Sequence, residues 1–459
     1  MLYQKLPRKC GGDIYLINSD NTATHYFAPD YLCAADAERI YSETAVKHII
    51  TIDPLFSVQN KDNLRSNIAE VIASRYSEDK TTDKRNITWE KFLENGKQIN
   101  NFEENTDHSI RLFSAFTSGS TGEPKEVLHS SESVLGMVDQ LSLFPCLKEP
   151  RDLWLDAVIP PIVVSCIVAG MCYPLADGKR LALDPYCKLE DIDIEMMYYQ
   201  PSDWALVPML LEALLESQRI PQNYDMSYFK MLGFGAEPIN RRTVEKALAF
   251  LKEHNCHAPL SAGYGQSESG SGVTTAFNAD MLLSGSSGIP HIDTIVSIFE
   301  PHTTQELKYH EIGEICKTGP GIMLGYADQK QTEEVLKIHP DGKLWLHTGD
   351  TGYMTEDGQL FVLGRGGMKV FPDKVVFPLE IENKLSLADG VKDAVVVAGK
   401  DPDNAGFEVP YLFIVPEKDI SQESVLASVR AFIEAELLPE QKPKDIFLID
   451  KKPFSKFKV

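Results

Sequence analysis

The sequence has no closely spaced cysteine pair and little positive charge for its length. Its eight cysteines are scattered along 459 residues, and none stands in a C-x-x-C pair. This usage is typical of reduced, structural cysteines in a cytoplasmic protein and argues against a zinc site. Lysine and arginine number 45 against 67 aspartate and glutamate residues, a formal net charge of −22. Such a balance argues against nucleic acid or an anionic membrane surface as the main partner.

The sequence also gives no sign of a secretory leader or a membrane span. Met1–Lys5 leads into polar sequence rather than into an apolar segment, which predicts no signal peptide. Residues 157–176 carry no charge and are long enough to cross a bilayer. They contain three prolines and lie between Asp156 and Asp177. We therefore expect a buried strand, a turn and a short buried helix there.

Strands and helices alternate through the middle of the chain. Between residues 111 and 364, apolar runs such as Trp204–Val207 and Met231–Phe234 are separated by segments with helical spacing, such as Pro208–Ser217. The alternation predicts a large α/β domain with mostly parallel, buried strands. After Pro290 the strands become shorter and are separated by glycine turns, which predicts a small β-rich subdomain at the end of this part.

A glycine-rich junction separates the last segment of the chain. Gly364-Arg365-Gly366-Gly367 gives the backbone unusual freedom, and we place a hinge at residues 365–367. Residues 365–459 have strands and helices of their own, which predicts a small, mobile C-terminal α+β domain.

A stretch rich in hydroxyl groups and glycine, Thr117–Lys125, follows an apolar strand at Leu112–Phe116. Backbone amides and hydroxyls of such a loop can surround phosphate oxygens. The stretch is not a Walker A loop, because Gly122 is followed by Glu123 and Pro124 rather than by Lys and Ser or Thr. Taken alone, it is also compatible with a surface turn.

Other polar residues suit the binding of a nucleotide. Tyr264 offers a face on which a purine can stack, Glu268 a carboxylate for Mg²⁺, and Asp350 an acceptor for ribose hydroxyls. Lysine and arginine side chains offset phosphate charge. Each residue alone also has a plainer interpretation, Tyr264 as a core aromatic and the two acids as loop carboxylates.

Together, these segments resemble the adenylate-forming superfamily of acyl- and aryl-CoA synthetases, peptide-synthetase adenylation domains and luciferases. Thr117–Lys125 resembles its phosphate loop, TSG(S/T)TGxPK, and Tyr264–Glu268 resembles its YGxTE motif with serine for threonine. Gly313–Tyr326 resembles its GE…GP…GY motif, and Trp345–Asp350 with Gly364-Arg365 resembles its W-x-x-TGD…GR segment. The resemblance spans residues 112–459, with an AMP-binding core in residues 111–364.

The resemblance implies two half-reactions. In the first, a substrate carboxylate attacks the α-phosphate of ATP, giving acyl-AMP and pyrophosphate. In the second, the small domain rotates about the hinge and the thiol of CoA or of a phosphopantetheine group attacks the adenylate. The implied cofactors are therefore ATP and Mg²⁺, with CoA or phosphopantetheine as acceptor.

The resemblance also assigns roles to individual residues. It implies that Lys458 bridges the carboxylate and the phosphate, and that Ser267 and Glu268 contact the α-phosphate and Mg²⁺, with Glu268 as the metal ligand. Asp350 and Arg365 would hold the ribose. The full set of implied nucleotide-binding residues is Thr117, Ser118, Gly119, Ser120, Thr121, Gly122, Lys125, Gly235, Ala236, Glu237, Tyr264, Gly265, Asp350, Arg365 and Lys369.

Four features depart from the family pattern. Residues 1–110 are a short lead for this family, so we expect a reduced N-terminal subdomain. Residues 160–164 are aliphatic where an aromatic residue or histidine is frequent, and the aspartate that holds a substrate ammonium is missing. Pro372 replaces a glycine that lets a pantetheine arm approach, and Phe457 replaces the glycine before the terminal lysine. We therefore expect an acid without an α-amino group, and adenylation is better supported than thiol delivery.

The leading hypothesis is an ATP-dependent acid–thiol ligase that forms acyl-AMP and transfers the acyl group to CoA or to a carrier protein. Its partners would be a small carboxylic acid and, where the acceptor is not CoA, an acyl carrier protein, with no nucleic acid and no membrane span. One alternative is a stand-alone adenylation enzyme that loads an amino or aryl acid onto a carrier protein. An alternative of another class is a non-catalytic nucleotide-binding protein.

Overall fold

The structure, a computed structural model, describes residues 94–97, residues 107–451 with short gaps, and the backbone of four N-terminal strands. The gaps are residues 118–123, 144–151, 160–161, 185–186, 372–373, 403, 405 and 419. Most of the glycine-rich loop, Pro372 and Lys458 lie outside the described residues. The N-terminal strands form one sheet in the order β1-β2-β3-β4, with bounds Ile14–Ile17, Ala23–Ala28, His48–Thr51 and Asn86–Thr88.

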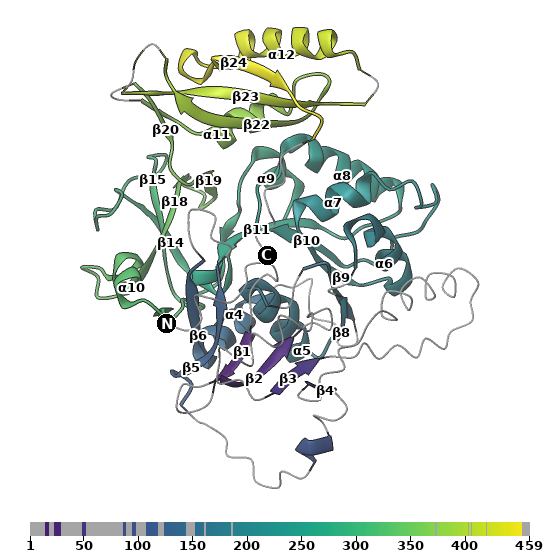
Figure 1. Ribbon diagram of the computed structural model, residues 1–459, viewed down its shortest axis with the longest axis vertical. Coiled ribbons are helices and arrows are strands. Elements are labelled where there is room, and N and C mark those ends of the chain that lie inside the picture. The colour runs from purple at the N-terminus through teal and green to yellow at the C-terminus, as the bar shows by residue number, and fades with distance from the viewer. Residues whose placement is uncertain are drawn as a thin grey trace.

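A seven-stranded sheet forms the centre of the large domain (Figure 1). Its strand order is β13-β12-β11-β10-β9-β7-β8, and the five strands from β8 to β11 are parallel. This confirms the predicted α/β class. The strands are β7 (Leu153–Ala157), β8 (Arg180–Asp184), β9 (Asp203–Leu206), β10 (Met231–Gly235), β11 (Leu260–Gln266), β12 (Ser271–Ala276) and β13 (Ile289–Pro290).

Helices cover both faces of this sheet. Neighbouring side chains of a strand point to opposite faces, so they enter different cores. Leu155 of β7 packs in a core with the helices α6 to α9, whereas Trp154 packs in a second core with α4 and α5. These helices are α4 (Ser131–Ser142), α5 (Tyr173–Ala176), α6 (Ile192–Tyr199), α7 (Pro208–Leu215), α8 (Arg241–Glu253) and α9 (Ala279–Ser284), with the π-helix η3 (Cys166–Cys172) and the 3₁₀ turns η4 (Leu189–Asp191) and η5 (Ser267–Ser269).

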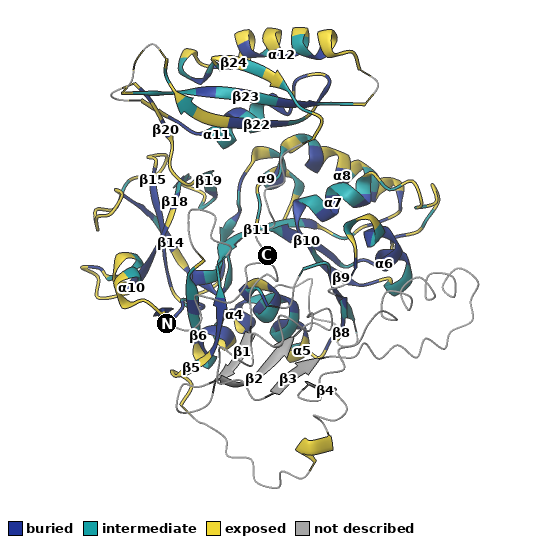
Figure 2. Ribbon diagram, viewed as in Figure 1, coloured by how far each residue is buried: buried dark blue, intermediate teal, exposed yellow. Residues whose placement is uncertain are grey.

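Local sequence explains where these helices begin. The side chain of Asn240 accepts a hydrogen bond from the amide of Thr243 and caps α8, which satisfies one of the free amides of the first turn. Val244, Ala247 and Leu251 then recur at helical spacing, and all three are buried in the core that includes the sheet. Figure 2 shows that α8 has both buried and exposed parts. Helix α7 begins with Pro208. Proline suits the first helical position because the backbone N–H that it lacks would have no acceptor within the helix there.

The glycine-rich loop connects two antiparallel strands. It joins β5 (Arg111–Phe116) to β6 (Glu126–Ser130), which pair with each other, and β6 also pairs with β16 (Gly325–Tyr326). This three-stranded sheet is separate from the parallel sheet. The expected strand before the loop is present, and its residues Phe113–Ala115 are buried.

A β-rich part follows, as predicted from the glycine turns after Pro290. Its sheet has the order β14-β15-β18-β17, with β19 added on β18. Its elements are β14 (Ile295–Phe299), β15 (Gly313–Thr318), α10 (Gln329–Val335), β17 (Leu336–Ile338), β18 (Leu344–Met354) and β19 (Leu360–Gly364).

The last part of the described chain forms a small α+β unit above helix α8 (Figure 1). Ala394, Val396, Leu412 and Ile414 belong to its buried core with α11 and α12. The elements are β20 (Met368–Phe371), β21 (Lys374–Val376), α11 (Pro378–Leu385), β22 (Val391–Lys400), β23 (Glu408–Pro416), α12 (Gln422–Glu436), the 3₁₀ turn η6 (Pro439–Gln441) and β24 (Asp445–Leu448).

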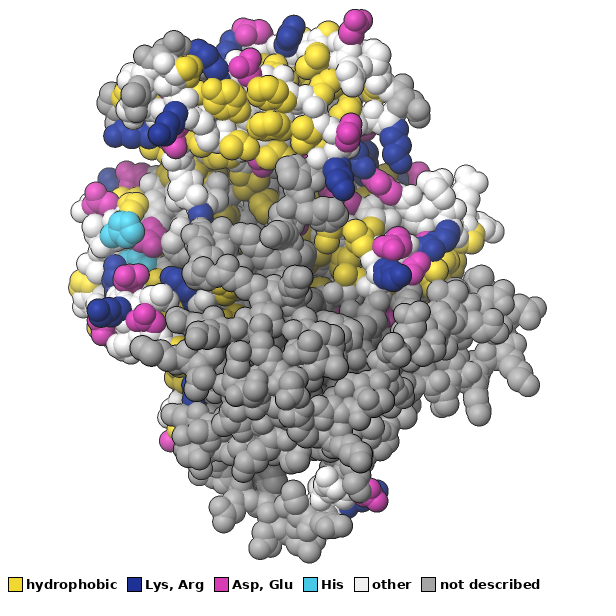
Figure 3. All heavy atoms as spheres, viewed as in Figure 1, with side chains coloured by type: hydrophobic (Ala, Val, Ile, Leu, Met, Phe, Trp, Pro, Cys, Tyr) yellow, Lys and Arg dark blue, Asp and Glu magenta, His cyan; other side chains and the backbone are white. Residues whose placement is uncertain are grey.

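The opposite face of the β22-β23-β24 sheet is apolar and open, and Figure 3 shows hydrophobic side chains gathered over it. Phe413 stacks on Phe447 with 5.1 Å between ring centroids, and Val397 is exposed on the neighbouring strand. The small unit also contacts helix α8, where Arg242 donates to the carbonyl of Val391 at 2.8 Å and forms an ion pair with Glu417.

Among the described residues, no helix combines the length and the apolar character that crossing a membrane requires.

One buried lysine makes the stability of this fold depend on pH. The side chain of Lys317, on β15, is fully buried, and its ammonium donates to the carbonyl of Pro320 at 2.6 Å. Burial lowers the pKa of Lys317 from 10.5 to about 7, because an apolar environment disfavours the charged form. The charged form is therefore less favourable in the folded protein than in the unfolded chain.

We expect Lys317→Met to stabilise the protein most at low pH. Between pH 7 and 10.5 the unfolded chain binds the extra proton and the folded chain does not. Wild-type stability should therefore rise with pH in this window, by up to about 1.4 kcal/mol per pH unit relative to the variant. Urea unfolding of both proteins at pH 6 and pH 9.5 measures this difference. Parallel pH profiles for the two proteins would contradict it.

Candidate active site

The carboxylate of Asp350, on β18, accepts hydrogen bonds from side chains of two other parts of the chain, β11 and the residue after β19. Its Oδ2 accepts a hydrogen bond from the hydroxyl of Tyr264 at 2.8 Å and one from Nε2 of Gln266 at 3.2 Å. Its Oδ1 accepts from Nε of Arg365 at 2.7 Å. The structure therefore brings together Tyr264, Asp350 and Arg365, three residues that the sequence analysis predicts to bind the nucleotide.

The electrostatics of this group follow from burial and from Asp350. Burial and the neighbouring carboxylate raise the pKa of Tyr264 well above its usual value, so Tyr264 acts as a neutral donor. Burial lowers the pKa of Arg365, but the charge and hydrogen bond of Asp350 outweigh it, and the net pKa is raised. Arg365 is therefore a permanent cation beside Asp350.

Glu268 lies in the turn after β11 and is buried. Its Oε1 accepts a hydrogen bond from the hydroxyl of Tyr326 at 2.6 Å. Its backbone carbonyl accepts from the amide of Met323. Because only one of the two carboxylate oxygens is bonded within the described residues, the other is available as the kind of hard oxygen ligand that Mg²⁺ prefers. Glu268 thus fits the predicted metal ligand.

The two ends of the glycine-rich loop are tied together. The amide of Thr117 donates to the carbonyl of Lys125 at 2.9 Å, and the amide of Lys125 donates to the hydroxyl of Thr117 at 3.0 Å. These bonds close the base of the loop. Ser118, Gly119, Ser120, Thr121 and Gly122 lie outside the described residues, and their proposed contacts with phosphate stay predictions.

Close backbone approach explains two of the predicted glycines. A Cβ on Gly265 would lie 1.7 Å from the carbonyl oxygen of Ser271, and one on Gly235 would lie 2.9 Å from that of Gly263. Both distances exclude a side chain unless the backbone moves. Ala236, which follows Gly235, has a φ of 68° in the left-handed region that is costly for non-glycine residues. Gly235, Ala236 and half-buried Glu237 therefore form a strained turn at the end of β10.

Three other predicted residues are less closely connected to this group. Ser267 is half-buried, and its carbonyl accepts a hydrogen bond from Nε2 of His129 at 2.8 Å. The side chain of Lys369 is exposed on β20, and its amide donates to Glu408 within the small unit. Lys458 lies outside the described residues. The roles of all three stay predictions.

A second group of residues supports the irregular part of β18 that carries Asp350; its members lie within the quoted motifs, but the sequence assigned them no role. Glu314 accepts hydrogen bonds from Nδ1 of His347 at 2.9 Å and from the amide of Gly349 at 3.3 Å. Burial acts to raise the pKa of Glu314, but these hydrogen bonds outweigh it and lower the pKa. The hydroxyl of Thr348 donates to the carbonyl of Ile315 and accepts from the amide of Asp350. These bonds fix the orientation of Asp350.

Glu314, Cys316 and His347 also resemble a metal site in composition. Their potential ligand atoms all lie within 4.8 Å of one another, and all three side chains are buried. However, hydrogen bonds from His347, from Gly349 and from the amide of His302 already occupy the carboxylate of Glu314. We therefore assign this group to support of β18 around Asp350.

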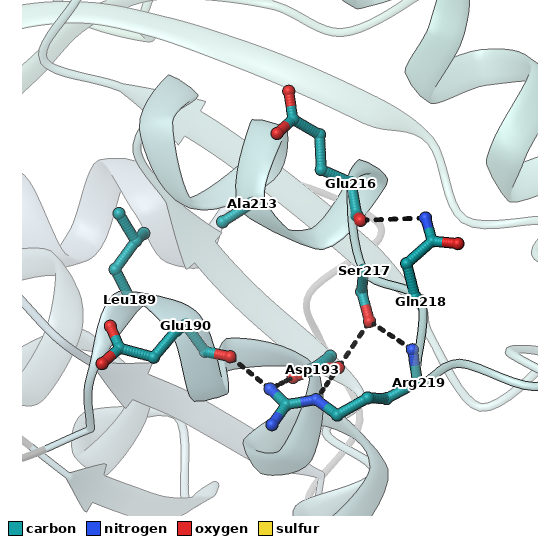
Figure 4. A pocket seen from close by; sticks show the side chains of 8 residues that line it. All are labelled: Leu189, Glu190, Asp193, Ala213, Glu216, Ser217, Gln218 and Arg219. Atoms are coloured by element: carbon teal, nitrogen blue, oxygen red, sulfur yellow. Dashed lines mark hydrogen bonds and ion pairs between the residues drawn. The ribbon is translucent and has the colours of Figure 1, made fainter. Parts of the chain in front are cut away.

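A surface pocket of about 360 Å³ lies beside α7, and it contains none of the predicted site residues (Figure 4). Arg219 crosses it and pairs with Asp193 and Asp191. The hydroxyl of Ser217 also donates to the carboxylate of Asp193. Its central charges are thus paired with one another, and the pocket is separate from the candidate active site.

Comparison with known sequences places the chain in a family. The sequence model described as AMP-binding enzyme matches residues 23–327, and the model described as AMP-binding enzyme C-terminal domain matches residues 380–456. The first match alone covers well over half of the chain. The protein therefore belongs to the AMP-binding enzyme family, the adenylate-forming class that its motifs resemble.

Curated relatives include 4-coumarate-CoA ligase 2 of Narcissus pseudonarcissus, 30% identical over 68% of this chain and 54% of the relative. Another is 2-succinylbenzoate–CoA ligase of Listeria monocytogenes, 30% identical over 74% of this chain and 66% of the relative. The chain thus spans between about half and two thirds of these relatives. Among solved structures, the anthranilate CoA ligase AuaEII in complex with anthranoyl-AMP is similar in fold, with a TM-score of 0.74, 16% identity and coverage of 95% of this chain and 76% of that chain.

We expect Asp350→Asn to weaken AMP binding. The change removes the negative charge that Arg365 and Tyr264 contact, and a hydrogen bond to a charged group contributes about 1.5–3 kcal/mol, which corresponds to roughly 10- to 100-fold in affinity. Calorimetric titration with AMP measures it. Asp357→Asn, an exposed change in the same β-rich part, is the matched control. Equal AMP affinities for Asp350→Asn and the wild type would contradict the assignment.

Proposed function

We propose that the protein is an ATP-dependent acid–thiol ligase that activates a small carboxylic acid as acyl-AMP and transfers the acyl group to CoA. The observation that carries this proposal is the convergence of Tyr264, Asp350 and Arg365 between β11 and the middle of β18, with Glu268 close enough for its charge to act on Arg365, in a member of the AMP-binding enzyme family. The printed names of the relatives, which are CoA ligases, support CoA as the acceptor.

In the proposed first step, an oxygen of the substrate carboxylate attacks the α-phosphorus of ATP, and the bond from this phosphorus to the bridging oxygen of pyrophosphate breaks. Positioning and charge compensation carry such a reaction. Residues 117–125 would hold the departing phosphates, and Ser267 and Glu268 the α-phosphate and Mg²⁺. When bound, Mg²⁺ would neutralise charge that develops on the phosphates. Tyr264 would lie against adenine, and Asp350 and Arg365 would hold the ribose.

In the proposed second step, the thiol sulfur attacks the carbonyl carbon of the adenylate, AMP leaves, and the thiol proton passes to solvent. We infer that residues 111–364 form the catalytic core and that residues 365–459 rotate as a mobile domain about residues 365–367. The φ values of Gly364 and Gly366, 112° and 67°, are ones that glycine adopts without strain, which supports a hinge there. A carrier-protein phosphopantetheine is the alternative acceptor.

The substrate class follows from the residues of the expected acid pocket. Residues 160–164 are aliphatic, and the chain lacks the aspartate that holds a substrate ammonium, which favours an acid without an α-amino group.

The eight scattered cysteines support a cytoplasmic location.

Carboxylate-dependent exchange of pyrophosphate into ATP tests the first step. We expect exchange with at least one acid of a panel of aliphatic, aryl and amino acids, and dependence on Mg²⁺. Thioester formation with CoA, or with a carrier protein carrying phosphopantetheine, then identifies the acceptor. Absence of exchange with every acid, in a protein that still binds ATP, would support the non-catalytic alternative.

Lys458→Ala tests the assignment of the bridging lysine. We expect it to reduce exchange by roughly 10²–10³-fold, the usual effect of removing one transition-state donor, while ATP affinity is retained. Lys456→Ala, two residues earlier in the same segment, is the matched control and should exchange normally. An unchanged exchange rate in Lys458→Ala would remove this lysine from the mechanism.

A further inference from the structure

The phenol of Tyr326 lies between two residues of opposite charge. Its hydroxyl donates to Oε1 of Glu268 at 2.6 Å, and the ammonium of Lys125 lies 4.7 Å from the centre of its ring. The face of an aromatic ring attracts cations, whereas a phenol hydroxyl donates to anions. One neutral side chain thus contacts both the cation that ends the glycine-rich loop and the predicted metal ligand.

The backbone fixes Tyr326 in this place. Strand β16 pairs with β6 so that Tyr326 lies opposite Val127, two residues after Lys125. The amide of Met323 donates to the carbonyl of Glu268, and the amide of Ala327 donates to the carbonyl of Glu126. The short segment 323–327 is therefore bonded to the turn that carries Glu268 at one end and to the strand after the loop at the other.

Burial strengthens this arrangement. Tyr326 is 7% exposed, as is Glu268. Burial, followed by the charge of Glu268, raises the pKa of Tyr326, so the phenol keeps its proton and stays a donor. Within the described part of the chain, Lys125 and Glu268 form no direct ion pair. If they did, each charge would neutralise the other and neither would be free for phosphate or metal.

We propose that Tyr326 is a positioning residue that holds Glu268 in orientation for a divalent cation and keeps Lys125 apart from it, free to meet phosphate. This inference rests on the proposed function, since it concerns the metal and phosphates of bound ATP. Tyr326 would act only through Glu268 and Lys125. Its two contacts are separable, because the hydroxyl serves Glu268 and the ring serves Lys125.

Two substitutions separate the contacts. Tyr326→Phe removes the hydroxyl and keeps the ring. We expect it to raise the Mg²⁺ concentration that half-saturates ATP binding roughly tenfold, the usual effect of losing a partner of a metal ligand, and to leave ATP affinity without Mg²⁺ unchanged. Tyr326→Leu removes the ring as well and should also weaken ATP binding without Mg²⁺. Calorimetric titrations at a series of Mg²⁺ concentrations measure both quantities.

The matched control is Tyr309→Phe, because Tyr309 is 57% exposed; it should behave as the wild type. Lys125→Met tests the other contact from the opposite side: ATP affinity without Mg²⁺ should fall while the half-saturating Mg²⁺ concentration is retained. The thermal midpoint of each variant separates loss of folding from loss of positioning.

The outcomes also separate this inference from the proposed function. A wild type that exchanges pyrophosphate normally, together with a Tyr326→Phe variant of unchanged Mg²⁺ dependence, would overturn the positioning role alone. A lower thermal midpoint without a shift in Mg²⁺ dependence would do the same. A wild type that binds no ATP at any Mg²⁺ concentration would overturn both.

Discussion

The hydrogen-bonded carboxylate of Asp350 connects the main parts of this protein. Tyr264 and Gln266 reach it from the end of the parallel sheet, Asp350 itself belongs to the β-rich part, and Arg365 reaches it from the junction with the small unit. A largely buried carboxylate is costly unless hydrogen bonds and an opposite charge compensate it. Because two of the donors come from β11 and the third, Arg365, follows β19, that compensation requires these segments to be assembled correctly around β18.

The residues around Asp350 hold its carboxylate in a fixed orientation, and this orientation suits it to accept hydrogen bonds. Glu314 and His347 hold the part of β18 before it, and the pairing of β11 with β12 fixes the strand end that carries Tyr264 and Gln266. A carboxylate held this firmly needs little reorganisation to accept ribose hydroxyls, and preorganised polar groups are the main means by which such a site stabilises charge. The same logic extends through Tyr326 to Glu268 and Lys125.

Much of the fold could be predicted from the sequence because local patterns determine it. In the strand Met231–Gly235, Leu232 and Phe234 are buried in the core on one face of the sheet and Met231 in the core on the other, as its near-continuous apolar run indicates. The small β-rich sheet after Pro290 and the α+β character of the last part were also predictable. What the pattern did not give is the pairing of the strands: the loop at residues 118–123 joins antiparallel strands of a separate sheet.

The candidate site was predictable only in part, for the same reason. The motifs imply roles for Tyr264, Glu268, Asp350 and Arg365. Tyr326 and Gln266 also belong to these motifs, but nothing in the sequence indicates which residues they contact. Tyr326 is 58 positions from Glu268, and Gln266 is 84 positions from Asp350. Contacts at such separations depend on strand register and loop closure, which no local pattern contains.

The sequence by itself determined the class of fold, the adenylate-forming motifs and the residue types that suit a nucleotide, because these depend on composition and short-range spacing. Only the tertiary structure decided which charges meet. It paired Arg365 with Asp350, bonded Glu314 to Gly349 of β18 next to Asp350, and placed one phenol between Lys125 and Glu268. The physical reason is that the energy of a charged group depends on burial and on neighbours within a few ångströms, and folding brings those neighbours from distant parts of the chain.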